Sequence, residues 1–370
     1  MKLSQFKFRL PQEQIAQYPS SFMYDENGKI VYKAKNDLLT DRDECRLLVL
    51  HAKSGDIEHK IFKELYQYYD EGDLFVLNDA QVFPAVMTGN KEKTNAHIEV
   101  FLLRELNPRL KLWDVLVEPA RKIRVGNKLY FGPDNSLVAE VIDNTTARGR
   151  TVRFLYDGTH DEFKRDLFAL GTTPLPKHIH RPAEPEDEQR FQTIFATKEG
   201  AVVAPAAGCN FTRELLKRIE IVGANYTFIT LYSSVSIFNE IDVEDLTKHK
   251  LESEQIEVND EVCNLFNEAY RNEKKICAVG TTVLRTLESA STTQGLIKPF
   301  SGWTNRFIFP PYTFNTANCL ISNLQLPQST MLMNQCAFGG YRKVMDAYAE
   351  ALREGYRFGF YGDAIMILPD

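Results

Sequence analysis

The sequence lacks the short motifs by which many cofactor-dependent and hydrolytic enzymes are recognised. It contains no GxGxxG, no P-loop, no HExxH and no GxSxG. These patterns build dinucleotide, nucleoside-triphosphate, zinc-protease and serine-hydrolase sites, respectively. A nicotinamide-dependent enzyme and a serine or zinc hydrolase are therefore disfavoured.

Cysteine pairs and long apolar runs are absent too. The six cysteines are scattered without a CxxC pair, which argues against a zinc cage or a disulfide framework and favours reduced, mostly buried thiols. Residues 1–10 lack the apolar core of a signal peptide. No apolar run approaches membrane-spanning length. We therefore expect a cytoplasmic protein that does not cross a membrane.

Positive charge is not in excess, because the formal net charge is −6. Much of the negative charge lies in residues 240–261, which contain nine acidic residues and only two lysines, Lys248 and Lys250. The rest of the chain is close to neutral and can hold local basic patches. Within one such patch, residues 104–128, the candidates for contact with RNA phosphates are Arg121, Lys122 and Arg124. The alternative is a solvated surface of strands and turns.

The 370 residues are enough for a large core and for two domains. Residues 73–156 contain short strand-like runs at close spacing without an amphipathic helix, which predicts a small antiparallel barrel. Strands alternate with helices across residues 161–368, which indicates an α/β arrangement. We therefore predict an α/β main domain, residues 1–72 and 157–370, with a small antiparallel β-barrel domain inserted at residues 73–156.

Residues 275–290, KICAVGTTVLRTLESA, predict a strand, a glycine turn and a helix. The apolar run 276–279 is typical of a strand buried on both faces. Gly280 ends it, and the hydroxyls of Thr281 and Thr282 can cap the helix that follows. Such a turn can hold an anion or a polar substrate at the helix N-terminus, although an ordinary α/β crossover has the same pattern.

The loop TTPLPKHIHRP carries His178 and His180, which could in principle share a metal ion. No third ligand lies near them in the sequence. We therefore expect surface histidines and no metal site.

Several segments resemble one family, the S-adenosylmethionine:tRNA ribosyltransferase-isomerases, which build epoxyqueuosine in tRNA. The segments are the opening KLSQFKFRLPQEQIAQYP, PLPxxIxR at residues 174–181, RFQT at 190–193, AVGTTxxRTLES at 278–289 and YGDAxMI at 361–367. The resemblance covers nearly the full length and implies a β-barrel inserted into a larger α/β domain. It also implies tRNA and S-adenosylmethionine as partners, the latter as a substrate, with no separate cofactor.

The resemblance implies an unusual reaction in which S-adenosylmethionine donates its ribosyl group. In that scheme the sulfonium acidifies the adjacent ribose carbon, a base removes a proton and adenine leaves. The aminomethyl group of a deazaguanine already in tRNA then attacks, and methionine departs as an epoxide closes. Such chemistry needs a positioned acid or base and hydrogen-bond donors that face the ribose hydroxyls.

The sequence departs from the family in several signatures. APTAGLHFT is APAAGCNFT, TLHVGxGTF is TLYSSVSIF, HxMHSE is HKLESE, NFHLP is NLQLP and NDTRVIPAR is NDAQVFPAV. The replacements place these residues at family His, Thr or Arg positions: Gln81, Val86, Ala206, Asn210, Tyr232, Glu252 and Gln325.

Two hypotheses follow. In the first, the chain is a diverged enzyme of the same activity, with a carboxylate such as Glu252 or Glu254 as general base. In the second, it is a retasked or inactive paralogue that binds a nucleoside ligand or RNA without this reaction, since fold alone does not imply function. A scaffold without any small ligand is a third alternative.

The enzyme hypothesis assigns roles to residues of the matching motifs. The candidate catalytic residues are Glu252, Glu254, His249 and Asp363. The candidate substrate-binding residues are Arg181, Gly280, Thr281, Thr282, Arg285, Asn210 and Tyr232. We expect a monomer or a weak homo-oligomer.

Overall fold

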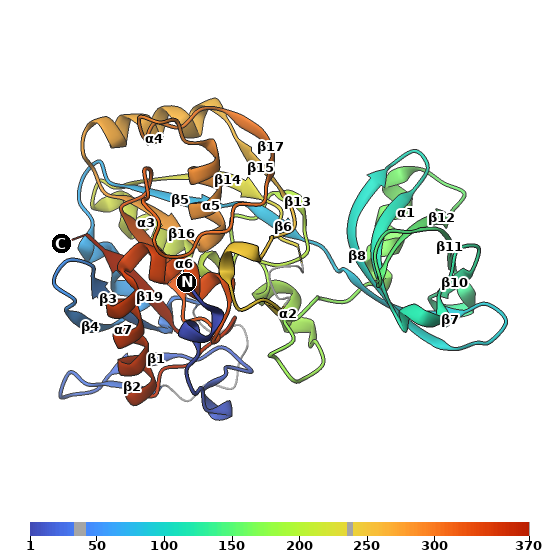
Figure 1. The fold of residues 1–370 in the computed structure, drawn as a ribbon, viewed down its shortest axis with the longest axis horizontal. Coiled ribbons are helices and arrows are strands. Elements are labelled where there is room, and N and C mark those ends of the chain that lie inside the picture. Colours follow the sequence, from blue (N-terminus) through green and yellow to red (C-terminus); the bar gives the residue numbers. More distant parts are fainter. Residues whose placement is uncertain (33–41, 235–239, 370) are drawn as a thin grey trace. The chain divides into compact units, whose positions relative to one another are not determined.

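The computed structural model describes residues 1–32, 42–234 and 240–369. The chain forms two compact units (Figure 1). The large unit comprises Met1–Gln81, Pro176–Pro182 and Gln189–Asp370, and the barrel unit comprises Val82–Leu175 and Ala183–Glu188.

The barrel unit is a closed antiparallel barrel in the order β10-β11-β12-β9-β8-β7. Its strands are β7 (Val86–Lys91), β8 (His97–Asn107), β9 (Leu112–Glu118), β10 (Lys128–Phe131), β11 (Leu137–Asn144) and β12 (Gly149–Leu155). Buried and exposed side chains alternate along β8 and β9, as a barrel with one solvated face requires. Helix α1 (His160–Leu170) packs Phe163 on Phe154 of β12 with ring centroids 5.3 Å apart.

The predicted fold class, an α/β domain with an inserted antiparallel barrel, is confirmed. The predicted barrel boundaries at 73 and 156 are wrong. Strand β5 (Leu74–Asn78) belongs to the large sheet, and all its residues are buried because its pairing on both edges is parallel. At the other end the barrel unit extends to Leu175, because α1 buries its apolar face on the barrel.

The large unit is built on a nine-stranded sheet in the order β17-β15-β14-β5-β16-β18-β19-β3-β4. Besides β5, its strands are β3 (Arg46–His51), β4 (Ile57–Ile61), β14 (Asn225–Leu231), β15 (Glu254–Val258), β16 (Ile276–Val279), β17 (Phe300–Thr304), β18 (Cys319–Asn323) and β19 (Ala364–Leu368). Strands β14, β5, β16 and β18 run parallel to one another. The smaller elements are β1 (Phe22–Tyr24), β2 (Ile30–Tyr32), β6 (Ala80–Val82), β13 (Lys198–Ala201) and α2 (Pro185–Arg190).

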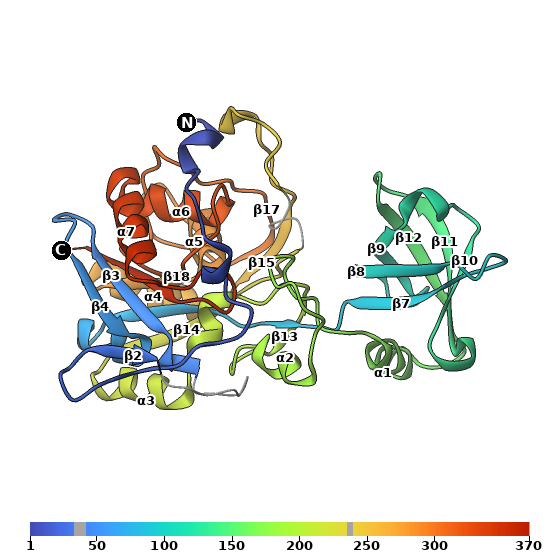
Figure 2. The same cartoon turned by 90° about the horizontal axis from the view of Figure 1, so that it is seen from below.

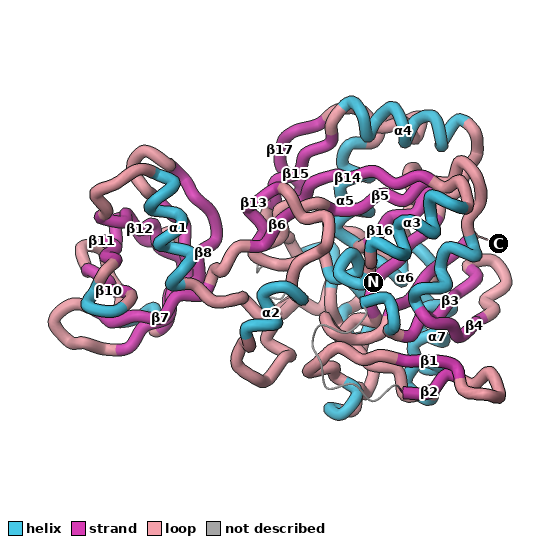
Figure 3. The backbone as a smooth tube through the Cα atoms, turned by 180° about the vertical axis from the view of Figure 1, so that it is seen from behind, coloured by secondary structure: helices cyan, strands magenta, loops and turns pink. Residues whose placement is uncertain are grey.

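Helices cover both faces of this sheet (Figure 2). One face packs against α4 (Asp260–Arg271), α5 (Thr281–Ala290), α6 (Thr330–Gly339) and α7 (Tyr341–Arg353), and the other against α3 (Arg213–Ile221). Figure 3 shows the same layers from behind. Residues of β5 alternate between the two cores, with Leu74 and Val76 in one and Phe75 and Leu77 in the other.

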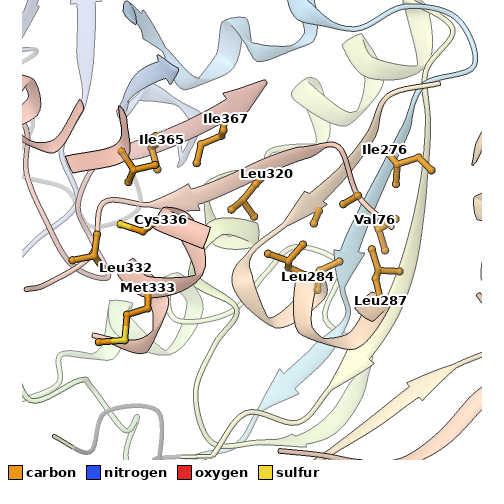
Figure 4. Packing of buried hydrophobic residues seen from close by; sticks show 14 of the residues in the cluster. Val76, Ile276, Leu284, Leu287, Leu320, Leu332, Met333, Cys336, Ile365 and Ile367 are labelled. Carbon is orange, nitrogen blue, oxygen red and sulfur yellow. The ribbon is translucent and has the colours of Figure 1, made fainter. Parts of the chain in front are cut away.

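The core on the α5–α6 face is drawn in Figure 4. Leu284 and Leu287 of α5 and Leu332, Met333 and Cys336 of α6 are buried against the sheet. All six cysteines lie in the described residues and are free and buried. No helix in the described ranges has both the length and the apolar character needed to cross a bilayer.

Candidate functional site

A pocket of about 500 Å³ opens at the carboxyl ends of the parallel strands of the large sheet. In chain order these strands are β5, β14, β16 and β18, but β14 lies on one side of β5 and β16 on the other. The strand order therefore reverses between β5 and β16. Open α/β sheets bind ligands outside the carboxyl ends of their strands at such a reversal. The pocket lies where this rule places a ligand site.

The turn between β16 and α5 forms one wall of the pocket. Gly280, Thr281 and Thr282 all line it. Gly280 has a φ of 98°, a conformation that favours glycine, and its N–H donates to the Ile321 carbonyl at 2.7 Å. The N-cap is Gly280 itself, without a side-chain cap, so the predicted capping by the threonine pair is wrong. Both threonines lie in the first turn of α5 instead.

Side-chain oxygens from three strand ends lack partners in this pocket. Ser233 follows β14, Thr282 follows β16 and Asn323 ends β18. Within the described part of the chain, Ser233 Oγ, Thr282 Oγ1 and Asn323 Oδ1 have no hydrogen-bond partner. A buried polar group without a partner costs about 1–3 kcal/mol. A ligand with hydroxyl or amino groups would remove that cost.

A buried ion pair supports the Ser233 segment. Arg285 Nη1 of α5 lies 2.6 Å from Glu254 Oε2, with the two side chains 6% and 1% exposed. The other Glu254 oxygen accepts a hydrogen bond from the Ser234 N–H at 2.9 Å. The Ser233 carbonyl accepts one from the Val202 N–H, also at 2.9 Å. Arg285 and Glu254 are not among the described residues that line the pocket. Their contacts instead hold the Ser233–Ser234 segment in place, so they act as positioning residues.

The other three candidate catalytic residues also lie outside the described pocket lining. Glu252 is exposed on the loop before β15. His249 packs edge-on against Phe307 at 5.0 Å, and burial lowers its pKa. Asp363 is fully buried and accepts hydrogen bonds from the Arg46 and Arg357 N–H groups, both at 2.8 Å. Burial raises the pKa of Asp363 to about 6.

Three candidate substrate-binding residues, Arg181, Asn210 and Tyr232, are not among the described residues that line the pocket. The Arg181 guanidinium stacks 4.1 Å from the Tyr18 ring centre and donates to the Gln17 carbonyl. Asn210 is 3% exposed. Tyr232 donates to Glu257 at 3.4 Å, and burial raises its pKa to about 12. Residues 235–239 of the same signature lie outside the described residues.

Comparisons with known proteins identify the family of this chain. The family model described as "Queuosine biosynthesis protein" matches residues 3–367. The chain belongs to this family. It is 59% identical to the S-adenosylmethionine:tRNA ribosyltransferase-isomerase of Phocaeicola vulgatus, over 100% of this chain and 99% of that protein. It is 52% identical to the protein of the same name from Flavobacterium psychrophilum, over 100% of both chains.

A solved structure of a related protein has a similar fold. The crystal structure of an S-adenosylmethionine tRNA ribosyltransferase from Thermotoga maritima matches with a TM-score of 0.53 and 30% identity. The match covers 98% of this chain and 100% of that one. The resemblance inferred from the sequence motifs is therefore confirmed.

Several pocket residues of this family member were missed by sequence reasoning. His178 and His180 line the pocket, so the expectation of surface histidines is wrong for His178, which is half-buried. Ser233 and Asn323 were not singled out at all. A signal existed for Asn323, because it is a polar residue at the carboxyl end of the buried run Cys319–Asn323. Nothing comparable marks Ser233.

The predicted basic cluster lies in the barrel unit. Arg121, Lys122 and Arg124 are exposed on the turn between β9 and β10. The guanidinium of Arg150, 6% exposed, donates to the carbonyls of Ala120 at 2.8 Å and Ile123 at 3.0 Å. The turn is therefore fixed from beneath while its three cations face solvent.

Proposed function

We propose that this chain transfers and isomerises the ribosyl group of S-adenosylmethionine onto the aminomethyl-deazaguanine of tRNA, giving epoxyqueuosine-tRNA. The observation that carries the proposal is the 59% identity, over the whole chain, to a protein that bears this enzyme's name. The pocket at the reversal of strand order supports it, because its unpartnered oxygens suit a ribose and its carboxyl-edge position suits a nucleoside.

The retasked-paralogue hypothesis rested on replaced signature residues, and their positions weaken it. Asn210, Tyr232 and Glu252 are not among the described residues of the pocket wall. Ala206 and Gln325 do line the pocket, but both leave room for a ligand. The replacements therefore do not remove the cavity that the reaction needs.

S-adenosylmethionine is proposed as a substrate that binds in this pocket, with no separate cofactor. Ser233, Thr282 and Asn323 would bond the ribose hydroxyls and neighbouring polar atoms. The titratable side chains on the described pocket wall are Lys177, His178, His180 and Glu240. The Nε2 atom of His178 already accepts a hydrogen bond from the Phe360 N–H, so the group that moves the proton is to be sought among Lys177, His180 and Glu240. Glu252 is disfavoured, because its exposed position lacks the apolar surroundings that would tune a carboxylate as base.

The direct test follows adenine release from S-adenosylmethionine in the presence of tRNA that carries the aminomethyl-deazaguanine. We expect release by the wild-type protein and no release without that tRNA. We also expect Glu252→Gln to retain release within about twofold, as for a surface change away from the site. Folded protein that binds S-adenosylmethionine but releases no adenine would restore the paralogue hypothesis. If Glu252→Gln still binds S-adenosylmethionine but no longer releases adenine, Glu252 is a catalytic residue after all.

The proposed tRNA contact lies on the turn that carries Arg121, Lys122 and Arg124. Replacing all three with serine is expected to weaken tRNA binding and to make the plot of log affinity against log salt less steep by about two, because fewer counterions are released. Filter binding or anisotropy at several salt concentrations measures both. The matched control replaces Arg213, Arg271 and Arg342, exposed on helices of the large unit, with serine. An equal change in both triple variants would move the RNA surface away from this turn.

The remaining expectations are proposals of the same kind. A tRNA-modifying enzyme with free, buried cysteines suits the reducing cytoplasm. A monomer or weak homo-oligomer stays a prediction, which light scattering would measure.

A further inference from the structure

The loop 176–182 holds an imidazole at the pocket wall that none of the sequence signatures explains. The side chain of Gln17 fixes this loop on both sides of His178. Its Nε2 donates to the His178 carbonyl at 2.9 Å, and its Oε1 accepts from the His180 N–H at 2.6 Å. Ile179, 5% exposed, anchors the loop between them. The position of His178 is therefore set by its backbone.

The ring of His178 is oriented by the segment between α7 and β19, which contains Gly359 and Phe360. Nε2 lies 3.1 Å from the Phe360 backbone nitrogen, whose N–H can only donate. Nε2 is therefore the acceptor, which assigns the ring proton to Nδ1. Gly359 leaves room for this contact, since a Cβ there would lie 2.6 Å from Nε2. His178, Gly359 and Phe360 all line the pocket.

The imidazole is neutral at physiological pH. Burial, and secondarily the neighbouring His180, lower the pKa of His178 to about 4. Protonating Nε2 would also set two N–H groups against each other at 3.1 Å. The other titratable groups on the described pocket wall are Lys177, His180 and Glu240. Because the ring is neutral, His178 is not suited to release a proton as a general acid. Because the Nε2 lone pair already accepts a hydrogen bond, the ring is not suited to take up a proton as a general base either.

We infer that His178 binds the pocket ligand by donating a hydrogen bond from Nδ1–H, as a neutral imidazole, to an acceptor atom of the nucleoside. The inference rests on the proposed function only in taking S-adenosylmethionine as that ligand. Nδ1 forms no hydrogen bond within residues 1–32, 42–234 and 240–369, so this donor is available. Neutrality matters because S-adenosylmethionine carries a sulfonium, which a protonated imidazole in the same pocket would repel.

The test measures S-adenosylmethionine binding by calorimetry, without tRNA. His178→Phe is expected to raise Kd about tenfold, the usual effect of one lost hydrogen bond. His178→Asn, which places an amide N–H near the Nδ1 position, is expected to recover most of the affinity. The ratio of mutant to wild-type Kd is expected to be the same at pH 6 and pH 8, because His178 is neutral at both.

A second variant leaves His178 in place. Gly359→Ala puts a methyl group against Nε2 and is expected to weaken binding as His178→Phe does. Wild-type affinity in both His178→Phe and Gly359→Ala would overturn the inference, as would a ratio that grows at pH 6. Failure of the proposed function looks different, because the wild type would then bind S-adenosylmethionine without releasing adenine. Absence of wild-type binding would overturn the inference together with the ligand assignment.

Discussion

Ala206→Trp is expected to abolish S-adenosylmethionine binding and, with it, adenine release. Ala206 begins the 3₁₀ turn Ala206–Asn210 and lines the pocket. An indole there would occupy space that the ligand needs within a cavity of about 500 Å³. Loss of even a few contacts worth about 3 kcal/mol raises Kd about 100-fold, and calorimetry measures it.

Two controls separate exclusion from misfolding. Ala206→Thr introduces the residue that the related signature carries at this position, and it is expected to bind within a few-fold of wild type. Ile221→Trp adds the same side chain at a residue of α3 that is 73% exposed, and it is expected to leave S-adenosylmethionine binding unchanged. If Ala206→Trp binds S-adenosylmethionine normally, the ligand lies elsewhere and the pocket assignment is wrong.

Arg285→Leu is expected to destabilise the large unit by about 3–5 kcal/mol, because it leaves the Glu254 carboxylate buried without its partner. The guanidinium also donates to the Arg306 carbonyl at 3.0 Å, so a second bond is lost. Adenine release is expected to fall as well, because the Ser233–Ser234 segment loses its support.

Tryptophan fluorescence can follow the large unit alone. The chain has two tryptophans, of which Trp113 lies in β9 of the barrel unit and Trp303 in β17 of the large sheet. Urea unfolding in a Trp113→Phe background therefore reports the loss. Combining Arg285→Leu with Glu254→Gln is expected to cost less than the two single changes added together, since the pair is removed as a unit. Additive costs would show that the ion pair is not the supporting contact.

Local patterns predicted the elements around Gly280 well. The apolar run 276–279, the glycine and the helical spacing of Val283, Leu284 and Leu287 are all dictated within one segment, and the structure has them as β16 and α5. Strand β5 was misplaced because a short apolar run does not reveal whether its neighbours are parallel or antiparallel.

The site itself depends on strand order, which no segment encodes by itself. Ser233 and Asn323 line one pocket only because β14 and β18 lie on opposite sides of the β5–β16 pair. The roles of Arg285 and Glu254 were missed for the same reason. Sequence spacing shows two charged residues, whereas only the fold shows that each neutralises the other.

The position of β19 has a consequence for how the protein is made. This strand pairs with β18 on one side and with β3 on the other, so Ala364–Leu368, which is synthesised long after β3, joins the two parts of the sheet. At ribosomal rates of about 5–20 residues per second, about 15 to 60 s pass between the synthesis of β3 and the synthesis of β19. Throughout this interval Arg46–His51 presents an apolar strand with one edge unpaired. A nascent chain that stops before residue 364 would leave the edges of both β3 and β18 unpaired, and both edges are candidate sites of aggregation.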